Sequence, residues 1–292
     1  MSELPSKKIE SFSLTIRTMS PQDIRRLHQL SVAAGWMHRF EDWEFALQIG
    51  EGIYAADEIG RILGSAMFYP ITPDFGALGM VIIAPRMFET GTNDWLVDQM
   101  LQRSEGRNVV VCATPDAYPI YVAHGFRAGS TVFQIQGVVA DCPNVVPQGN
   151  ALVRVMRPDE TDRIRALDAA AYPVSRAGIL DVVLSAGSVA VIETDGEVTG
   201  YALCRAFGRG KAIGPIVAIT EADAVALVAH HVKENVGNFV RVDTACLDGP
   251  LQDHLFSCGL KHESSVIAMA RGTAHDLAGP QKIFGLLNQA IG

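Results

Sequence analysis

A short segment between Gly35 and Trp43 gathers side chains that are suited to binding an amine. It holds two indoles, a phenyl ring, an imidazole and two carboxylates: Trp36, His38, Phe40, Glu41, Asp42 and Trp43. Aromatic rings stack on the faces of sugars and other rings, and carboxylates hold ammonium groups. The segment therefore predicts a site for a small cationic molecule. The candidate contacts are Trp36, His38, Glu41 and Asp42. In the alternative interpretation, Asp42 caps a helix and Trp43 anchors that helix to the core.

Other motifs for catalysis or metal binding are missing from the sequence. His230 and His231 are adjacent, so on a helix their side chains diverge by about 100° and cannot easily share a metal ion. The chain has no HExxH, GxSxG or Walker-type loop. Its five cysteines include no CxxC pair, which is typical of reduced cytosolic thiols. We therefore expect no bound metal.

The composition limits the partners of the chain. It has 292 residues, 48% of them hydrophobic, and a formal net charge of −8. A negative balance argues against nucleic-acid binding and is compatible with a cationic substrate. No apolar run reaches the roughly 18–20 residues that span a bilayer, and no apolar stretch follows the N-terminal lysines. We expect a cytoplasmic protein, without membrane or nucleic-acid partners, that is a monomer or a homodimer.

Three short patterns in the first half of the chain recur in the same order in the second half. Ile16–Pro21 is echoed by Val155–Pro158, Ala56–Gly64 by Ile192–Gly200, and Tyr121–Phe126 by Leu255–Leu260. Gly64 and Gly200 are 136 positions apart, and Gly125 and Gly259 are 134 apart. A nearly constant offset predicts one domain-sized unit that is used twice.

The hydrophobic periodicity predicts the same order of elements in both halves. In the first half we expect strands over 14–19, 53–56, 62–71, 78–83, 109–112 and 131–138, and helices over 21–34, 41–48, 93–105 and 118–124. In the second half we expect strands over 152–156, 189–194, 197–207, 211–217, 239–243 and 264–270, and helices over 159–171, 179–186, 221–235 and 251–258. An amphipathic helix over 281–291 is predicted to end the chain.

This interleaving of strands and helices predicts a mixed α/β (α+β) fold. We expect two tandem domains, over 1–140 and 151–292, each with a mixed central sheet flanked by helices. Residues 141–150 contain two prolines, a glycine and two asparagines, which is typical of a linker.

The order of elements, with the pattern Tyr121-x-x-x-Gly125-Phe126, resembles the GNAT superfamily of acyl-coenzyme A N-acyltransferases. Over its whole length the chain resembles the subgroup with two tandem domains. Further segments similar to that subgroup are Gly35–Trp43, Gly214–Ala218, Met269–Gly272 and Ile283–Leu286. The resemblance implies acetyl-CoA as the cofactor and a small-molecule amine as the substrate.

In this superfamily the pyrophosphate lies against a glycine-rich loop that opens a helix, where free N–H groups and the helix dipole favour an anion. The loop has the form Pro-x-x-(Arg/Gln)-Gly-x-Gly-x-(Gly/Ala), and its counterpart here is Pro85–Asn93. Only Gly91 stands at an expected glycine, and Phe88 replaces the usual basic or amide residue. The resemblance implies cofactor contacts from Phe88, Glu89, Thr90, Gly91, Thr92 and Asn93, and from the preceding strand through Val81, Ile82 and Ile83.

The second copy lacks these features. Its loop over 218–223 contains no glycine and two carboxylates, so we expect the first domain to bind the cofactor and the second to be degenerate. The resemblance also implies that Tyr121 is the general acid that protonates the departing thiolate. The second copy has Leu255 there. Alternatively, Tyr121 only packs its helix onto the sheet, and Tyr118 is the reserve candidate.

The resemblance places the acceptor amine between the segment Gly35–Trp43 and the sheet, where the second domain completes its pocket. Asp74 and Asp116 are further candidate contacts at predicted loop ends, and Glu193 and Asp243 are polar residues in second-domain strands. The predicted function is acetyl transfer from acetyl-CoA to a primary amine of a small polar cationic substrate. An aminoglycoside-like amino sugar, and hence antibiotic modification and resistance, is the named hypothesis. Polyamine or amino-acid acetylation, and a non-catalytic ligand-binding protein, are the alternatives.

Overall fold

The computed structural model describes residues 4–9, 12–104, 106–172, 174–273 and 280–292. The elements of the first half are β1 (Ser6–Ile9), β2 (Phe12–Thr18), α1 (Ile24–Ala33), α2 (Phe40–Ile49), β3 (Glu51–Ala56), β4 (Ile62–Thr72), β5 (Phe75–Ile83), α3 (Thr92–Arg103), β6 (Asn108–Ala113), α4 (Tyr118–Ala123) and β7 (Arg127–Val138). Those of the second half are β8 (Leu152–Val155), α5 (Thr161–Ala171), α6 (Ala177–Ser185), β9 (Gly187–Thr194), β10 (Glu197–Phe207), β11 (Gly210–Ala218), α7 (Glu221–Lys233), β12 (Phe239–Thr244), α8 (Pro250–Ser257), β13 (Lys261–Arg271) and β14 (Lys282–Gly285).

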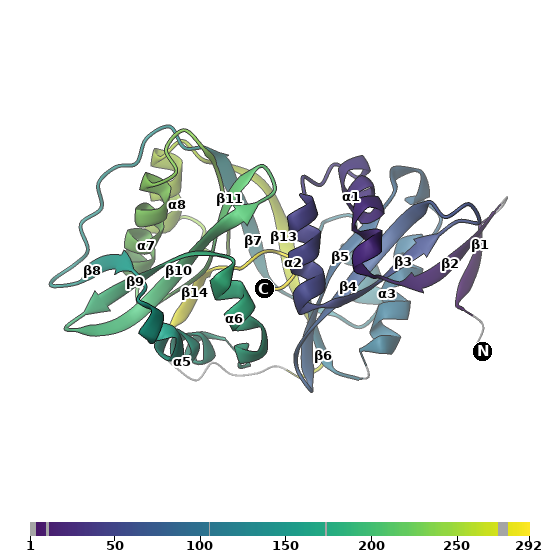
Figure 1. Cartoon of the computed structure of the whole chain (residues 1–292), viewed down its shortest axis with the longest axis horizontal. Coiled ribbons are helices and arrows are strands. Elements are labelled where there is room, and N and C mark those ends of the chain that lie inside the picture. The colour runs from purple at the N-terminus through teal and green to yellow at the C-terminus, as the bar shows by residue number, and fades with distance from the viewer. Residues whose placement is uncertain (1–3, 10–11, 105, 173, 274–279) are drawn as a thin grey trace.

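The mixed α/β fold predicted from the sequence is confirmed. From β2 to β7 and again from β8 to β13, strands and helices follow one another in the same order (Figure 1). The repeated motifs take equivalent places: Gly125 and Gly259 both follow a short helix and have positive φ angles of 82° and 92°, a conformation that glycine adopts without steric cost. Residues 139–151, which include the predicted linker, contain no helix or strand.

Helices cover both faces of the central strands. Residues Ile62–Tyr69 of β4 are buried without interruption, a pattern typical of a strand covered on both sides. α1 contacts α2, β4 and β5, while α3 packs on β3, β4 and β5. Figure 1 shows α1 and α2 in front of the sheet. No helix in the described ranges is long and apolar enough to cross a membrane.

The two copies exchange their last strands. β7 of the first half pairs with β12 of the second, from Val138 opposite Phe239 to Phe133 opposite Thr244. β13 of the second half pairs with β6 of the first and also with β7. The order of strands in the sheet is therefore β1-β2-β3-β4-β5-β6-β13-β7-β12-β11-β10-β9-β8. The halves share one continuous sheet, and each contains a strand that the chain supplies from the other half.

The hydrophobic core also crosses between the halves. One cluster of buried side chains joins first-half residues such as Trp43 and Leu78 to Ile164 of α5 and Leu180 of α6. A second cluster fills the second half beneath α7 and α8 and includes Ile135 of β7. Because burial of apolar side chains supplies most of the folding free energy, the halves stabilise each other.

The structure differs from the prediction in two elements. β1 was not predicted, and it pairs with β2. The terminal amphipathic helix over 281–291 is wrong: Lys282–Gly285 forms β14, which pairs with β11 from Ala218 to Ile216. The residues after β14 form turns. The apolar residues of this tail have a helix-like spacing, but the free edge of β11 offers backbone hydrogen bonds that decide in favour of a strand.

Candidate active site

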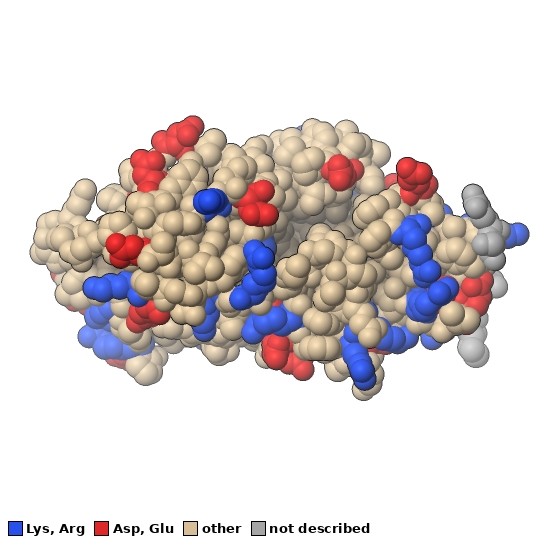
Figure 2. All heavy atoms as spheres, turned by 90° about the horizontal axis from the view of Figure 1, so that it is seen from above, with Lys and Arg blue, Asp and Glu red and all other residues tan. Residues whose placement is uncertain are grey.

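A cavity of about 850 Å³ lies between the two halves. Figure 2 shows a recess between the two halves when the molecule is viewed from above. The lining comes from the segment before α2, from β5, α3 and α4, from the exchanged strands β7 and β13, from β10 and β12, and from the residues after β14. Among the residues predicted from the sequence, the cavity brings together Trp36, His38, Asp42, Val81, Ile82, Ile83, Phe88, Asn93, Asp116 and Tyr121.

The floor of the cavity is the free edge of β5. β5 and β6 are parallel neighbours that pair only at Phe75–Ala77, and they diverge beyond that point. The edge that faces the gap continues over Val81, Ile82 and Ile83, which line the cavity. Such an edge presents unpaired N–H and C=O groups to whatever enters. These three residues were assigned to the cofactor by position, and the structure places them beside the cavity.

A bulge lies at the start of this free edge, at Met80. Met80 has a φ of 51°, which is uncommon outside glycine. The register of β4 with β5 shifts here, because Met67 lies opposite Gly79 and Ser65 lies opposite Ile82. The Ser65 hydroxyl donates to the Met80 carbonyl at 2.9 Å, which holds the distorted backbone in place. A bulge redirects backbone groups next to many active sites.

The corresponding cleft of the second half is filled by the chain itself. β11 and β12 also pair only briefly, at Lys211 and Ala212. β5 and β11 both contain 9 residues, so the stretch of β11 that corresponds to Val81–Ile83 is Ile216–Ala218. β14 pairs with β11 along that stretch. The position that is open in the first half is occupied in the second.

The loop after β5 leads into the N-terminus of α3. Gly91 precedes the helix with a φ of 67°, and the first N–H groups of an α-helix lack partners within the helix. Phe88 and Asn93 line the cavity; Phe88 is 67% exposed, and the side-chain Oδ1 of Asn93 is buried without a partner among the described residues.

The remaining loop residues do not line the cavity. The hydroxyls of Thr90 and Thr92 lie 2.6 Å apart and close the turn. Glu89 points outward to solvent. Lys7 of β1, which was not among the predicted site residues, donates from Nζ to the Gly91 carbonyl at 2.7 Å. The loop therefore combines a helix N-terminus with a nearby ammonium group, and both favour an anion.

Tyr121 of α4 is 3% exposed and faces the cavity. Its ring contacts Phe126 edge-on, with the ring centres 5.5 Å apart. Burial raises the pKa of the phenol, with a further contribution from Cys112, so the hydroxyl keeps its proton at neutral pH. Tyr118 packs against the core and is not part of the lining. Leu255, at the matching place in the second half, is fully buried.

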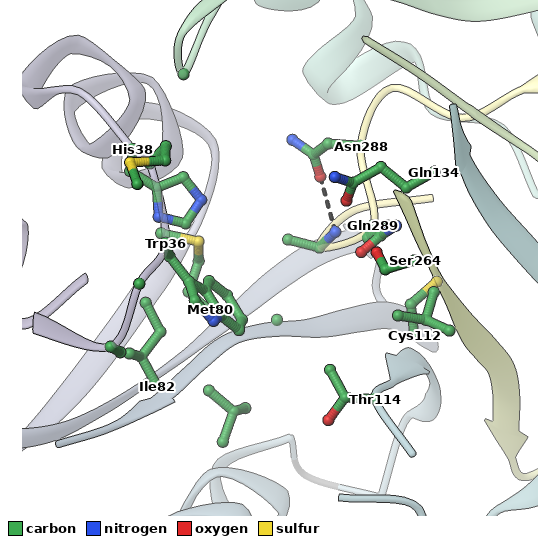
Figure 3. Close-up of a pocket in the computed structure, with 18 of the residues that line it drawn as sticks. Trp36, His38, Met80, Ile82, Cys112, Thr114, Gln134, Ser264, Asn288 and Gln289 are labelled. Atoms are coloured by element: carbon green, nitrogen blue, oxygen red, sulfur yellow. Dashed lines mark hydrogen bonds between the residues drawn. The ribbon is translucent and has the colours of Figure 1, made fainter. Parts of the chain in front are cut away.

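Trp36 and His38 project into the cavity on the side opposite Asn288 and Gln289 (Figure 3). The His38 ring lies 5.6 Å from Trp36, 6.1 Å from Trp43 and 5.7 Å from Phe207, measured between ring centres. Although the residue as a whole is half-buried, its Nδ1 is enclosed and has no hydrogen-bond partner in the described part of the chain. This burial lowers the pKa of His38 to about 4, so the imidazole is neutral near pH 7.

Asp42 lines the cavity, but its oxygens are engaged. They accept hydrogen bonds from the Arg39 backbone N–H at 2.8 Å, from the Arg39 guanidinium at 2.8 and 3.2 Å, and from the Gly208 N–H at 2.9 Å. These bonds hold the pKa of Asp42 below its usual value against the opposing effect of burial. Asp42 therefore caps α2 and ties it to the β10–β11 turn, which is the structural role that the sequence left open.

The other predicted carboxylates lie elsewhere. Glu41 is exposed on α2 and does not line the cavity. Asp74 lies in the turn between β4 and β5, where it accepts from the Thr72 hydroxyl at 2.7 Å, also outside the lining. Asp116 lines the cavity at an exposed position.

The two second-half carboxylates are in ion pairs. Glu193 pairs with Arg154 at 2.6 Å. Asp243 pairs with Arg241 at 2.9 Å and accepts from Gln289 at 3.0 Å. Burial raises the pKa of Asp243. Their polar character in strands is therefore explained by pairing within the protein.

Among the residues that the structure describes, two groups with metal-ligand chemistry lie outside this cavity. One ligand atom from each of Cys142, His254 and Cys258 falls within 4.8 Å of the others. The same holds for His230, His231 and Glu234. The expectation that His230 and His231 diverge was too strict, since the two rings lie 5.4 Å apart and Glu234 follows one turn later.

Comparison with known proteins agrees with the fold. Residues 164–285 match the family model described as the acetyltransferase (GNAT) domain. This match covers less than half of the chain, and together with the relative described next it supports an acetyltransferase enzyme. An uncharacterized N-acetyltransferase of Bacillus subtilis, YitH, is 23% identical over 283 residues, which cover 93% of this chain and 96% of that protein.

Solved structures extend the likeness over nearly the whole acetyltransferase. A structure from Pyrococcus horikoshii matches with a TM-score of 0.76 at 15% identity and covers 96% of both chains. A tandem GNAT protein from the clavulanic acid biosynthesis pathway matches with a TM-score of 0.63 at 13% identity, covering 89% of this chain and 99% of that one. At these identities the likeness establishes the fold.

Several residues that line the cavity of this acetyltransferase were not predicted from the sequence. They are Met80, Gln134, Arg205, Phe207, Arg241, Ser264, Asn288 and Gln289. Most come from the second half, from the exchanged strands or from the C-terminal tail. No local motif marks them, because only the pairing of distant strands brings them to the cavity.

Proposed function

We propose that the first half holds acetyl-CoA in the cavity and that the protein transfers the acetyl group to a primary amine of a small polar molecule. The observation that carries this proposal is the contrast between the two clefts. The free, bulged edge of β5 opens onto a cavity that contains Tyr121, whereas the equivalent edge of β11 is occupied by β14.

The residues present fit the cofactor in two places. The edge over Val81–Ile83 can exchange backbone hydrogen bonds with an extended amide-bearing arm. The N-terminus of α3, with Lys7 beside Gly91, can hold the phosphates. Acetyl-CoA, once bound, supplies the acetyl group as an activated thioester.

Tyr121 would then act on the leaving sulfur. Its raised pKa keeps the phenol protonated, and its hydroxyl makes no hydrogen bond to another described residue, so the proton is available to a thiolate. A nearby N–H of the β5 bulge would stabilise the oxygen of the tetrahedral intermediate.

The acceptor amine would enter the same cavity between Trp36 and His38 on one side and second-half residues on the other. The second half would thus complete the acceptor pocket without binding a cofactor of its own. An aminoglycoside-like amino sugar, a polyamine and an amino acid are the acceptor classes that the sequence proposed. A screen of thiol release from acetyl-CoA over all three classes would identify the acceptor.

Two measurements test the proposal. Calorimetry with acetyl-CoA should show a dissociation constant between about 1 μM and 1 mM, as for substrates of most enzymes. Absence of binding below millimolar concentration would leave only a non-catalytic binding protein. Tyr121→Phe should lower kcat by about 10²- to 10⁴-fold, the contribution of general acid catalysis, without weakening acetyl-CoA binding.

Tyr118→Phe is the matched control, because Tyr118 lies one turn from Tyr121 on α4 and outside the cavity. Its kcat should stay near that of the unmodified protein. Equal kcat values for Tyr121→Phe and Tyr118→Phe would remove Tyr121 as the acid.

A further inference from the structure

Arg205 of β10 is a buried cation in the cavity lining whose hydrogen-bonding capacity is largely unused. It is 3% exposed. Its Nε and one terminal nitrogen have no partner among the described residues, and the other terminal nitrogen makes only a long bond of 3.4 Å to the Ala206 carbonyl. A guanidinium carries five N–H donors, and buried donors are almost always satisfied. An arginine in this state is incomplete without a ligand.

The nearby carboxylates are paired with other groups and not with Arg205. Asp42 and Asp243 are close enough to act on it electrostatically, but Asp42 is engaged by Arg39 and Gly208, and Asp243 by Arg241 and Gln289. Each acid is therefore already paired with another arginine. Burial lowers the pKa of Arg205 to about 10, which still leaves it charged at neutral pH.

Aromatic contacts hold the guanidinium in position. Its central carbon lies 4.8 Å from the ring centre of Phe45 and 4.8 Å from that of Phe207. Stacked rings restrain the guanidinium plane and use none of its donors, because the N–H bonds lie in that plane. Phe45 belongs to α2 and Phe207 to β10, so this site exists only where the two halves meet.

We propose that the acceptor of this acetyltransferase carries a carboxylate as well as the amine, and that Arg205 binds this carboxylate through two parallel hydrogen bonds. Guanidinium and carboxylate match in this fork-like geometry. The acceptor class is a small amino acid or a close relative of one. The proposal rests on the proposed function, and it selects among the acceptor classes against polycationic amines, which an unpaired arginine repels.

The rest of the lining agrees with a molecule of both charges. The carboxylates of Asp116 and Glu263 face the same cavity from exposed positions, where they can receive an ammonium group as it enters. Asp42, the lining carboxylate that acts electrostatically on Arg205, is neutralised by Arg39. The lining thus combines the buried cation Arg205 with acids at exposed positions, where Arg209 is also exposed.

Paired substrates test the proposal. Amino acids should be acetylated with a kcat/KM at least tenfold, and up to about 10²-fold, higher than their uncharged amides, as expected for a charge-assisted pair of hydrogen bonds. Arg205→Met should remove this preference by lowering kcat/KM for the acids alone. Arg205→Lys, which keeps the charge but loses the fork, should restore only part of it. Arg165→Met, outside the cavity, should keep the full preference.

Binding measurements separate this proposal from the proposed function. Titration calorimetry of the whole protein with free amino acids, in the presence of CoA, should show binding that Arg205→Met loses while its affinity for acetyl-CoA is unchanged. A loss of acetyl-CoA affinity in Arg205→Met would assign Arg205 to the cofactor and overturn the proposal. Equal kcat/KM values for acids, amides and polyamines would also overturn it, with the transferase activity intact. Preference for a phosphorylated amine over the carboxylate would refute the carboxylate assignment.

Discussion

Protonation of His38 should couple the stability of this protein to pH. The enclosed imidazole has a pKa of about 4 in the folded protein, against about 6.5 in an unfolded chain. The unfolded state therefore binds the proton more tightly, so the free energy of unfolding falls as the pH drops below about 6.5 and stops falling below about 4. Between pH 7 and pH 5 this difference amounts to about 2 kcal/mol from His38 alone.

The assay compares how much unfolding free energy each protein loses between two pH values, rather than the absolute stabilities. Urea unfolding at pH 7 and pH 5 gives the loss of unfolding free energy for the unmodified protein and for His38→Gln, and the loss should be smaller by about 2 kcal/mol in the variant. His262→Gln, an exposed position on β13, controls for the removal of a histidine in itself. If His38→Gln and the unmodified protein lose the same free energy, the imidazole is not held neutral by burial and the reasoning fails.

Two further predictions concern a buried ion pair within the second half and the strands that join the halves. Arg176 and Asp168 form an ion pair of 2.6 Å with side chains 3% and 1% exposed, so Arg176→Met should lower the free energy of unfolding by about 3–5 kcal/mol, since it leaves a buried carboxylate with only the Tyr201 hydroxyl as its partner. Urea unfolding measures this, with Arg165→Met, which breaks an exposed pair, expected to change little; equal losses in both variants would contradict it. Residues 1–140 expressed alone should fail to unfold cooperatively, because β6 and β7 lack the β13 that lies between them, and co-expression with residues 141–292 should restore cooperative unfolding followed by circular dichroism. A cooperative transition of the isolated first half would show that strand exchange is dispensable.

The exchange of strands also bears on how the site is built. Gln134 of β7 and Ser264 of β13 both line the cavity (Figure 3), and each belongs to the strand that ends its copy of the repeat. The acceptor pocket and the shared sheet therefore depend on the same pairing. A substitution that weakens β7–β13 pairing should affect both stability and the shape of the cavity.

The sequence alone determined the order of elements, the repeat and the asymmetry between its copies. These follow from local patterns: periodic burial, proline and glycine at turns, and residue types such as Gly91 and Tyr121 that stand in one copy and not in the other. The predicted type of an element, helix or strand, was correct wherever the apolar residues of one buried face recurred along its whole length. It failed at β14, where a short apolar tail fits either a helix or an edge strand and the free edge of β11 decides.

The tertiary structure decided the pairing of β7 and β13, the filling of the second cleft and the position of Arg205. The burial patterns of β7 and β13 are nearly the same, as expected of two copies, so nothing local says which neighbour each strand selects. Arg205 has an unremarkable place in a strand pattern. The surroundings of its guanidinium are formed by Phe45, Asp42 and Asp243, which lie far from Arg205 in the sequence. Which charges are paired and which stay free is a property of contacts between distant segments, and only the folded chain determines it.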